Sequence, residues 1–182
     1  IMAGYRGDTI IVNGVVAPVA RVPAGLVRLR LLNGANARFF DLRFSDGRTF
    51  HVIASDGGYL AAPVAMRRLL IAPGERYEVL VDFKDGEEAV LETGADQNVP
   101  MMGMMGGGAA AAGGNVMKFE IDATAAPTIA AVPKKLIDVP TLDRSKIVGR
   151  RQFLLNDMMM GDGMMGGGTV GGQGFGPLMA IN

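Results

Sequence analysis

Hydrophobic and polar side chains alternate with a period of two along most of residues 9–122. In the stretch LVRLRLLN at residues 26–33, Val27, Leu29 and Leu31 face one way while Arg28 and Arg30 face the other. This alternation is typical of a β-strand with one buried face, and helical spacing does not fit it. The same pattern predicts further strands at residues 40–44, 50–54, 76–83 and 117–122.

Short turn signals separate these predicted strands. Glycine, Asn and Asp tolerate positive φ, and proline presets the φ of a turn. The turn dipeptides are Asn13-Gly14, Asn33-Gly34, Asp46-Gly47, Asp56-Gly57, Pro73-Gly74 and Asp85-Gly86. Short strands at this spacing favour an all-β antiparallel sandwich with Greek-key connections, and no helix longer than two turns is predicted. We expect this sandwich to occupy residues 1–122.

The composition changes after Asp122. Residues 123–149 are rich in Ala, Pro and Thr, and we expect an extended linker that lies over a surface. Residues 150–182 are expected to begin with one more strand, at residues 151–156, and to continue as a flexible Met/Gly-rich tail. The chain stops just after an apolar pattern resumes near residue 177, which favours a fragment of a longer protein.

Composition and charge narrow the classes of function. The chain has 182 residues, 49% of them hydrophobic, which is enough for one or two compact domains. Its 18 basic and 18 acidic side chains cancel. Because the basic residues are scattered, no nucleic acid is expected as a partner. No apolar run approaches the ~20 residues of a membrane helix, so no membrane span is predicted.

The side chains that are missing exclude several chemistries. The sequence has no Cys, and His51 is its only histidine. Disulfides, thiolate zinc sites and a blue copper centre therefore cannot form from these residues. A Ser-His-Asp site would need His51, and no nucleophile on a sharp turn accompanies it. We expect His51 to be a surface or interface histidine and not a metal ligand.

Nine of the 13 methionines fall in two glycine-rich runs. Glycine at this density disfavours a packed helix or strand, so exposed thioethers need another explanation. A thioether is a soft, neutral donor that suits Cu(I), and a flexible segment can fold several of them around one ion. The first run contains Met101, Met102, Met104 and Met105, and the second contains Met158, Met159, Met160, Met164 and Met165.

The second run also contains carboxylates. Asp157 and Asp162 can add an oxygen ligand and neutralise charge, so residues 157–165 are the predicted Cu(I)-binding segment. The first run has no acidic residue within it. The alternative for both runs is a disordered, low-complexity insertion in which Met has no ligand role, and for the first run the two interpretations stay equally open.

Three other features have ordinary structural interpretations. The stretch Asp56-Gly57-Gly58 is expected to be a turn and not a ligand cradle. The acidic residues 82–92 are expected to surround a hairpin that faces solvent. The excess of arginine between residues 21 and 48 fits a solvated sheet face, although arginine also favours domain interfaces with carboxylate partners.

Four motifs, in this order, resemble the middle cupredoxin domain of a three-domain multicopper oxidase. They are GDTIIVNG at residues 7–14, RLRLLNGANAR at 28–38, IASDGG at 53–58 and APGERYEVLV at 72–81. The resemblance covers about two thirds of the chain. It implies a cupredoxin-like Greek-key β-sandwich.

Within that family, the Met-rich segment resembles that of the bacterial cuprous oxidases of copper tolerance, in which Met and Asp ligands hold a substrate copper near the blue copper site. The stretch FLLNDMMMGD at residues 153–162 stands where that loop begins, and Asp162 matches the family's Asp ligand. The family's Met five residues earlier is Asp157 here, so Met158 would have to serve. The His-x-His pairs and the His-Cys-His motif that hold the family's catalytic copper are absent.

The resemblance implies a non-catalytic middle domain of a periplasmic enzyme that oxidises Cu(I) or a phenol and reduces O₂ to water. We call this longer enzyme the parent, and the resemblance implies copper as its cofactor. The implied partners are the parent's first and third cupredoxin domains and copper ions, and we expect no oxidase activity from this chain alone. Two alternatives stay open: a copper-free cell-envelope division protein that keeps the three-cupredoxin architecture, and a freestanding Cu(I)-binding module.

Overall fold

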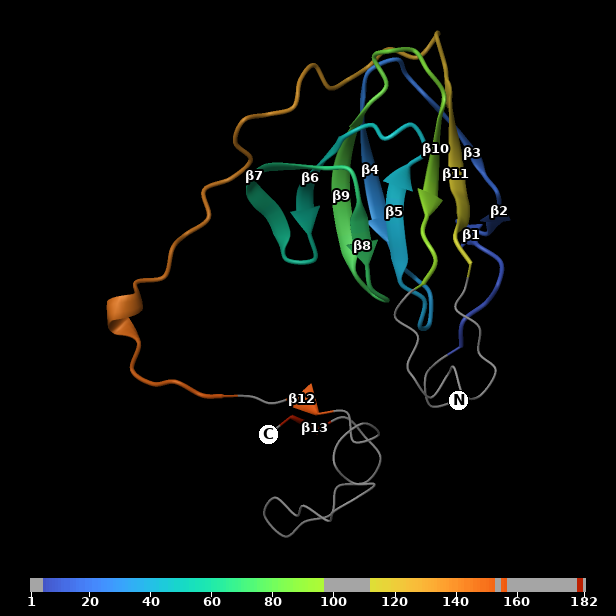
Figure 1. Ribbon diagram of the computed structural model, residues 1–182. Helices are drawn as coiled ribbons and strands as arrows, with labels where there is room; N and C mark the ends of the chain where they lie inside the picture. The colour runs from blue at the N-terminus through green and yellow to red at the C-terminus, as the bar shows by residue number, and fades with distance from the viewer. Residues whose placement is uncertain (1–4, 97–111, 153–154, 157–179, 182) are drawn as a thin grey trace. The chain divides into compact units, whose positions relative to one another are not determined.

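The computed structural model describes residues 5–96, 112–152, 155–156 and 180–181, which fall into two compact units, residues 1–139 and 140–182. The first unit is a sandwich of two β-sheets (Figure 1). The five-stranded sheet contains, in spatial order, β3 (Val19–Val22), β11 (Gly114–Ile121), β10 (Ala89–Thr93), β5 (Phe40–Phe44) and β8 (Leu69–Ile71). The four-stranded sheet contains β4 (Leu26–Leu32), β9 (Arg76–Asp82), β6 (Phe50–Ser55) and β7 (Gly58–Met66). A separate hairpin of β1 (Ile11–Val12) and β2 (Val15–Val16) precedes them.

The chain crosses repeatedly between the two sheets. It runs from β4 to β5, from β5 to the β6–β7 hairpin, then to β8, β9 and β10, changing sheet at each of these steps. The paired strands are antiparallel except β3 and β11, which are parallel. Within the described residues there is no α-helix. The predicted all-β, cupredoxin-like Greek-key sandwich is confirmed.

Most of the predicted turns owe their shape to glycine. The glycines at positions 14, 47, 74 and 86 have positive φ, as the turn dipeptides predicted. In the turn between β6 and β7 the positive φ, 121°, belongs to Gly58 and not to Gly57. Among the strands of the two sheets, the alternation pattern missed β3, β7, β8 and β10.

The prediction of a glycine turn at Asn33-Gly34 was wrong. Gly34 does not have positive φ, and Asn33 is buried at the end of β4. The Asn33 side chain donates to the carbonyl oxygens of Arg38 (2.8 Å) and Ile71 (3.0 Å) and accepts from the Ala35 N–H (2.9 Å). Asn33 therefore shapes this corner through its amide side chain, which supplies both donors and an acceptor.

The acidic residues 82–92 also differ from expectation. They do not surround a hairpin, because β9 and β10 belong to different sheets. Asp82, Asp85 and Glu87 are nevertheless exposed, as predicted for this stretch.

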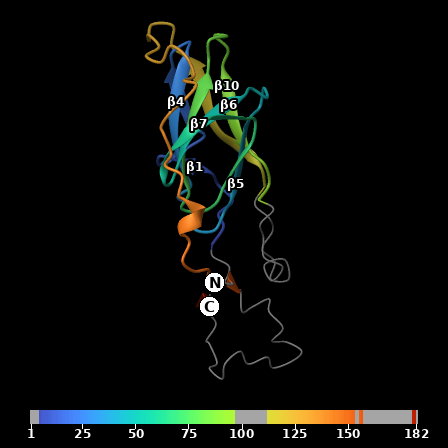
Figure 2. The same cartoon turned by 90° about the vertical axis from the view of Figure 1, so that its left-hand side faces the viewer.

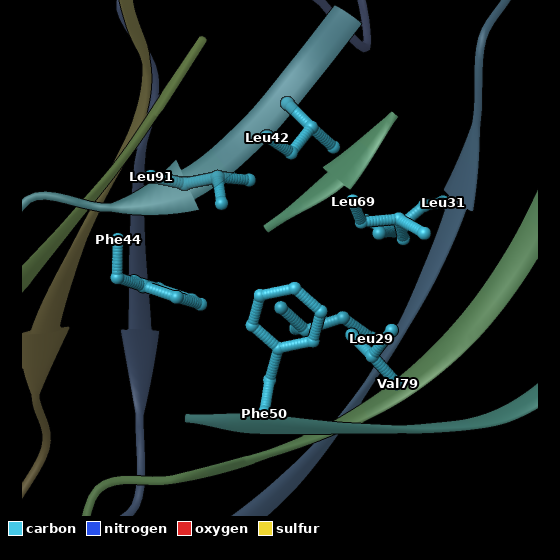
Figure 3. Close-up of a pocket in the computed structure, with 8 residues that line it drawn as sticks. All are labelled: Leu29, Leu31, Leu42, Phe44, Phe50, Leu69, Val79 and Leu91. Carbon is cyan, nitrogen blue, oxygen red and sulfur yellow. The ribbon is translucent and has the colours of Figure 1, made fainter. Parts of the chain in front are cut away.

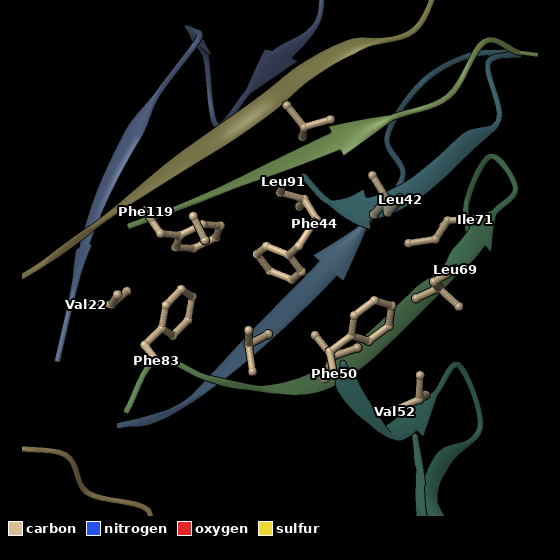
Figure 4. Packing of buried hydrophobic residues seen from close by; sticks show 14 residues of the cluster. Val22, Leu42, Phe44, Phe50, Val52, Leu69, Ile71, Phe83, Leu91 and Phe119 are labelled. Atoms are coloured by element: carbon tan, nitrogen blue, oxygen red, sulfur yellow. The ribbon is translucent and has the colours of Figure 1, made fainter. Parts of the chain in front are cut away.

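The core lies between the two sheets and is built around aromatic side chains (Figure 4). Phe83 follows β9 and is fully buried. Its ring centroid lies 5.3 Å from that of Phe119 and 6.3 Å from that of Phe44, both on the facing sheet. Offset and edge-to-face contacts of this kind add to the area that each ring buries.

One arginine closes the rim of this core. The Arg48 guanidinium lies 4.9 Å from the Phe83 ring centroid and is held by Asp46 (2.6 Å) and by the Asp82 carbonyl (2.9 Å). Its side chain is 10% exposed, so this arginine is part of the packing and not of a solvated face.

The outer face of the four-stranded sheet is partly covered by a segment that we call the strap, residues 123–139. Three apolar side chains of the sheet and three of the strap form a second, smaller cluster. The members are Leu26, Ile53 and Leu80 from the sheet and Ile129, Val132 and Leu136 from the strap.

The strap is fastened at both edges of that sheet. At the β4 edge, Ile129 forms a bridge with Leu26. At the β7 edge, the Leu136 N–H donates to the Ala61 carbonyl at 2.9 Å. Figures 1 and 2 show the strap, in gold and orange, running beside β4 and β7.

The second unit is small. Arg144–Lys146 form one turn of 3₁₀-helix, and the Asp143 side chain accepts from the Ser145 N–H at its start. β12 (Leu155–Asn156) pairs with β13 (Ala180–Ile181). The predicted strand at residues 151–156 was too long, because residues 151 and 152 are not in a strand. No helix formed by the described residues is long and apolar enough to cross a membrane.

The Phe83 side chain should dominate the stability of the sandwich. We predict that Phe83→Ala lowers the free energy of unfolding by about 3–5 kcal/mol, because it removes a fully buried ring and leaves a cavity. Urea denaturation followed by far-UV circular dichroism measures this change. Leu70→Ala, at a side chain in β8 that is 52% exposed, serves as control and should cost less than about 0.5 kcal/mol. Equal losses in both variants would contradict the core assignment.

Candidate functional site

The predicted Cu(I) ligands lie outside the described residues. This holds for all seven residues of the second run, Asp157, Met158, Met159, Met160, Asp162, Met164 and Met165, and for the four methionines of the first run. Within the part of the chain that the structure describes, no three or more His, Asp or Glu side chains are grouped to hold a metal ion. What the structure does define is the backbone on either side of each run.

The second run is flanked by a two-stranded ladder. Leu155 is paired with Ile181, and Asn156 with Ala180. Paired strands lie about 5 Å apart. Residues 156 and 180, which flank the segment 157–179, are therefore neighbours in space.

The first run is flanked by what we call the loop stem, residues 93–96 and 112–114. These residues continue β10 and β11, which pair through Thr93 and Gly114. The two sides of the stem are so close that a Cβ on Gly113 would lie 2.7 Å from the Thr93 carbonyl oxygen. A Cβ on Gly94 would lie 2.6 Å from the Asp41 carboxylate. Real Cβ atoms do not approach this closely, so a side chain at position 113 would clash with backbone atoms, whereas one at position 94 would have to displace the Asp41 carboxylate.

Two arginines hold the ends of the loop stem. Arg6 Nε lies 3.1 Å from Oδ2 of Asp96, whose carboxylate is fully buried. Arg38 Nη2 donates to the Ala112 carbonyl at 2.7 Å, and its guanidinium lies 5.1 Å from the Phe40 ring centroid. The ion pair with Arg6 compensates the buried charge of Asp96, and the hydrogen bond from Arg38 holds the Ala112 carbonyl, so the two contacts position residues 96 and 112.

The buried polar side chains of the described structure gather near this stem. They are Asn33, Arg38, Asp41, Thr93 and Asp96. Asp41 is bonded to the stem at two points, since its N–H donates to Thr93 Oγ1 (3.0 Å) and its carbonyl accepts from the Gly94 N–H (3.0 Å). Its carboxylate accepts from Arg68, and this hydrogen bond raises the pKa of Arg68 above its ordinary value.

Sequence reasoning missed the stem. Gly94 and Gly113 could have been noticed in the sequence, because one directly follows the strand before the first Met-rich run and the other directly precedes the strand after it. Arg6, Arg38 and Asp96 carry none, since their contacts join residues up to 90 positions apart in the chain.

The single histidine, His51, lies within the four-stranded sheet. It lies in β6, opposite Leu80 of β9 and Ala65 of β7, and is half-buried on the outer face of the sheet. It belongs to no metal-binding group within the described structure.

Among the residues that the structure describes, the gap between the two sheets is too small for a cofactor. The side chains in Figure 3 converge from both sheets and enclose a gap of about 10 Å³. Such a gap is close to the smallest that holds one water molecule, and an apolar gap stays dry. The lining residues are Leu29, Leu31, Leu42, Phe44, Phe50, Leu69, Val79 and Leu91.

A shallow depression of about 280 Å³ lies at the surface where the β6–β7 turn meets the start of β9. It is bordered by Tyr59, Tyr77 and Glu78 and by an ion pair in which Arg76 Nε lies 2.9 Å from Asp56 Oδ1. Burial, followed by the charges of Glu75 and Asp56, raises the pKa of Tyr77 above its ordinary value. Residues 56–58 thus form a turn, as predicted. The Asp56 carboxylate accepts hydrogen bonds from the backbone N–H and the side chain of Arg76, the first residue of β9.

Comparisons with known proteins agree on one family. Residues 4–91 match the model of the multicopper oxidase family. The cell division protein FtsP of Rahnella sp. is 54% identical over 91 residues, which are 50% of this chain and 19% of that protein. FtsP of Escherichia coli is 50% identical over 91 residues with the same coverage. This chain therefore aligns with about a fifth of the length of these relatives.

Solved structures extend the similarity to most of the chain, which carries a cupredoxin domain of the multicopper oxidase type. CueO, a laccase-like multicopper oxidase of the lignin-degrading bacterium Ochrobactrum sp., is 44% identical, and the alignment covers 87% of this chain and 33% of that one with a TM-score of 0.74. That protein has oxidase activity towards lignin model compounds and lignosulfonate. The multicopper oxidase McoA of the hyperthermophile Aquifex aeolicus is 30% identical, with 85% and 33% covered and a TM-score of 0.69.

Replacing a glycine of the loop stem should lower the stability of the protein by a measurable amount. We predict that Gly113→Ala lowers the free energy of unfolding by about 1–3 kcal/mol, because the new Cβ meets backbone atoms that cannot move aside. Thermal and urea unfolding of the purified chain measure the change. Gly57→Ala is the matched control, because no atom lies within 4 Å of its Cβ position and its φ is not positive. If Gly113→Ala proved as stable as Gly57→Ala, the tight packing of the stem would be refuted.

Proposed function

We propose that this chain, which carries a cupredoxin domain of the multicopper oxidase family, is the middle domain of a three-domain bacterial multicopper oxidase, with a Met-rich tail that binds Cu(I). The observation that carries the proposal is the match to CueO, which covers 87% of this chain and only 33% of the other. In this arrangement residues 1–122 are the domain, residues 123–149 the linker, and residues 150–182 lead into the third domain.

The residues of this chain do not fit the catalytic copper of the family. A blue copper centre takes two His and one Cys ligand. The chain has no Cys, and its single histidine lies in β6 beside apolar neighbours. No step of copper chemistry is therefore assigned to the sandwich itself.

In the proposal, the sandwich acts as a spacer between the parent's first and third cupredoxin domains. A rigid core such as that around Phe83 suits this role, because a spacer must hold two partners at a fixed separation. The parent oxidises Cu(I) or a phenol and reduces O₂ to water, and it works in the periplasm. Copper is held by the other domains, which supply the imidazole and thiolate ligands.

Cu(I) also enters the proposal as cargo of the second methionine run. Its thioethers are soft donors, and Asp157 and Asp162 bring negative charge to the same segment. The β12–β13 ladder supports the proposal, because it places residues 156 and 180, which flank the segment 157–179, side by side. A closed segment loses less chain entropy than an open one when several of its side chains gather around one ion.

A second candidate function has its own support. The identity to FtsP reaches 54%, higher than the 44% to CueO, although it extends over half of the chain. A parent of that kind is a cell division protein, and the sandwich would then be a scaffold element without copper. The Met-rich runs favour the oxidase, since a scaffold has no need of soft donors.

Cu(I) binding tests the tail directly. We expect this chain to bind Cu(I) saturably in anaerobic competition with a chromophoric Cu(I) chelator. Replacing Met158, Met159 and Met160 together by Leu keeps the volume and removes the sulfur. It should weaken binding by more than the roughly 10–100-fold that loss of an outer-shell partner costs.

Two control variants locate the site. Met117→Leu, in β11 and partly buried against the core, should leave Cu(I) affinity unchanged. Replacing the four methionines of the first run by Leu tells whether that run contributes. Unchanged affinity in the Met158, Met159 and Met160 variant would remove the second run as the Cu(I) site.

Oxidase activity separates this chain from its parent. We expect no O₂ consumption above the protein-free rate when this chain alone is given Cu(I) or a phenol, because it lacks the ligands of a blue copper centre. An oxygen electrode measures this rate, with the parent protein as the positive control. If the parent is equally inactive and its other domains contain no His-Cys-His motif, the scaffold function replaces the oxidase.

A further inference from the structure

The outer face of the four-stranded sheet is divided into two halves. Residues directly opposite each other in antiparallel strands share a face. The strap covers the half that contains Leu26, Ile53 and Leu80. The other half we call the arginine face, and it is formed by Arg28, Arg30, Leu32, Asp56, Tyr59, Arg76 and Glu78.

Charge on the arginine face is unbalanced. Glu78 lies between two arginines: its Oε2 accepts from Arg28 Nε at 2.6 Å, and its Oε1 lies 3.5 Å from Arg30 Nε. The closer bond raises the pKa of Arg28 above its ordinary value. Among the described residues, Glu78 is the only carboxylate paired with both Arg28 and Arg30, and Asp56 is paired with Arg76. The three arginines of this face therefore have two carboxylate partners, which leaves one positive charge in excess.

The opposite side of the sandwich has no such excess. On the five-stranded sheet, Arg43 Nε lies 2.7 Å from Glu92 Oε1. Lys118 Nζ lies 2.8 Å from Glu88 and 3.1 Å from Glu120. Both of these cations lie beside at least one carboxylate, and exposed ion pairs of this kind contribute little to stability.

The arginine face also has the composition of an interface. Leu32 is 66% exposed and Tyr59 is 43% exposed, and the Arg28 guanidinium lies 5.6 Å from the Tyr59 ring centroid. Arginine and tyrosine are enriched where protein surfaces dock, and the planar guanidinium favours carboxylates in a two-pronged geometry. Arg30, whose side chain is 77% exposed, is accessible for that contact.

We propose that the arginine face docks a carboxylate-bearing surface of the domain that follows this chain in its parent, with Arg30 as the main contact. The course of the strap selects that domain. The last described bond between the strap and the sheet joins the Leu136 N–H to Ala61 of β7, so the chain leaves the sandwich at an edge of the same sheet. A domain tethered beside the face has a high effective concentration for it. The inference rests on the proposed function, which supplies the neighbouring domain.

Arginine labelling tests whether the face is covered. Phenylglyoxal should modify Arg30 several-fold more slowly in the full-length parent than in this chain alone. Arg43, with a side chain 48% exposed on the opposite sheet, should react equally in both and is the matched control. Equal labelling of Arg30 in the two proteins would overturn the proposal.

A cross-link tests the chemistry of the partner. In the parent carrying Arg30→Lys, a carbodiimide should join position 30 to an Asp or Glu of the following domain, identified by mass spectrometry. A cross-link from position 30 only to Glu78, to the preceding domain or to nothing overturns the proposal. A parent with no second cupredoxin-like domain would instead remove the proposed function itself, so the two failures are distinguishable.

Discussion

Burial of Phe83 between the two sheets is the interaction on which the rest of the structure depends. Its ring contacts Phe44 and Phe119 on the facing sheet, and it directly follows β9 in the chain. Because β9 pairs with both β4 and β6, placing Phe83 sets the register of the whole four-stranded sheet. A slip of one residue would turn every inward side chain of β9 to the outside. The same register decides which side chains face outward, and these include Leu80, Glu78 and Arg76.

The outward side chains explain the strap. Leu26, Ile53 and Leu80 face away from the main core and would be exposed without residues 123–139. By pairing with Leu26 and Ala61, the strap also occupies bonding positions on β4 and β7, the two edges of the sheet. Open strand edges invite pairing with other chains, so one segment both covers apolar surface and protects two edges. At the edge of the other sheet, β8 is only three residues long.

In the proposed function, the sandwich provides a rigid frame and other parts of the protein bind copper. The sandwich holds its shape through aromatic packing and supplies no ligand for catalytic copper. The first methionine run lies between β10 and β11 in the sequence, and the second follows the sandwich. The backbone beside each run is held in place, by the loop stem for the first run and by the β12–β13 ladder for the second. The similarity to both CueO, an oxidase, and FtsP, a cell division protein, fits this division, because one fold can host different functions.

The sequence by itself determined the fold class and five of the nine strands of the two sheets, because alternation with period two and glycine turns are local properties of the chain. It also determined what the chain cannot do, since no conformation supplies a missing Cys or a second His. Only the tertiary structure decided the roles of the polar residues. Three arginines with similar sequence surroundings have different roles. Arg48 packs against the Phe83 ring at the edge of the core, and Arg38 donates to the Ala112 carbonyl of the loop stem. Arg30 shares the carboxylate of Glu78 with Arg28. These outcomes depend on partners 30 or more positions away, such as Asp82 for Arg48 and Ala112 for Arg38. Sequence periodicity carries no information about such long-range contacts, which exist only once the two sheets have closed on the core.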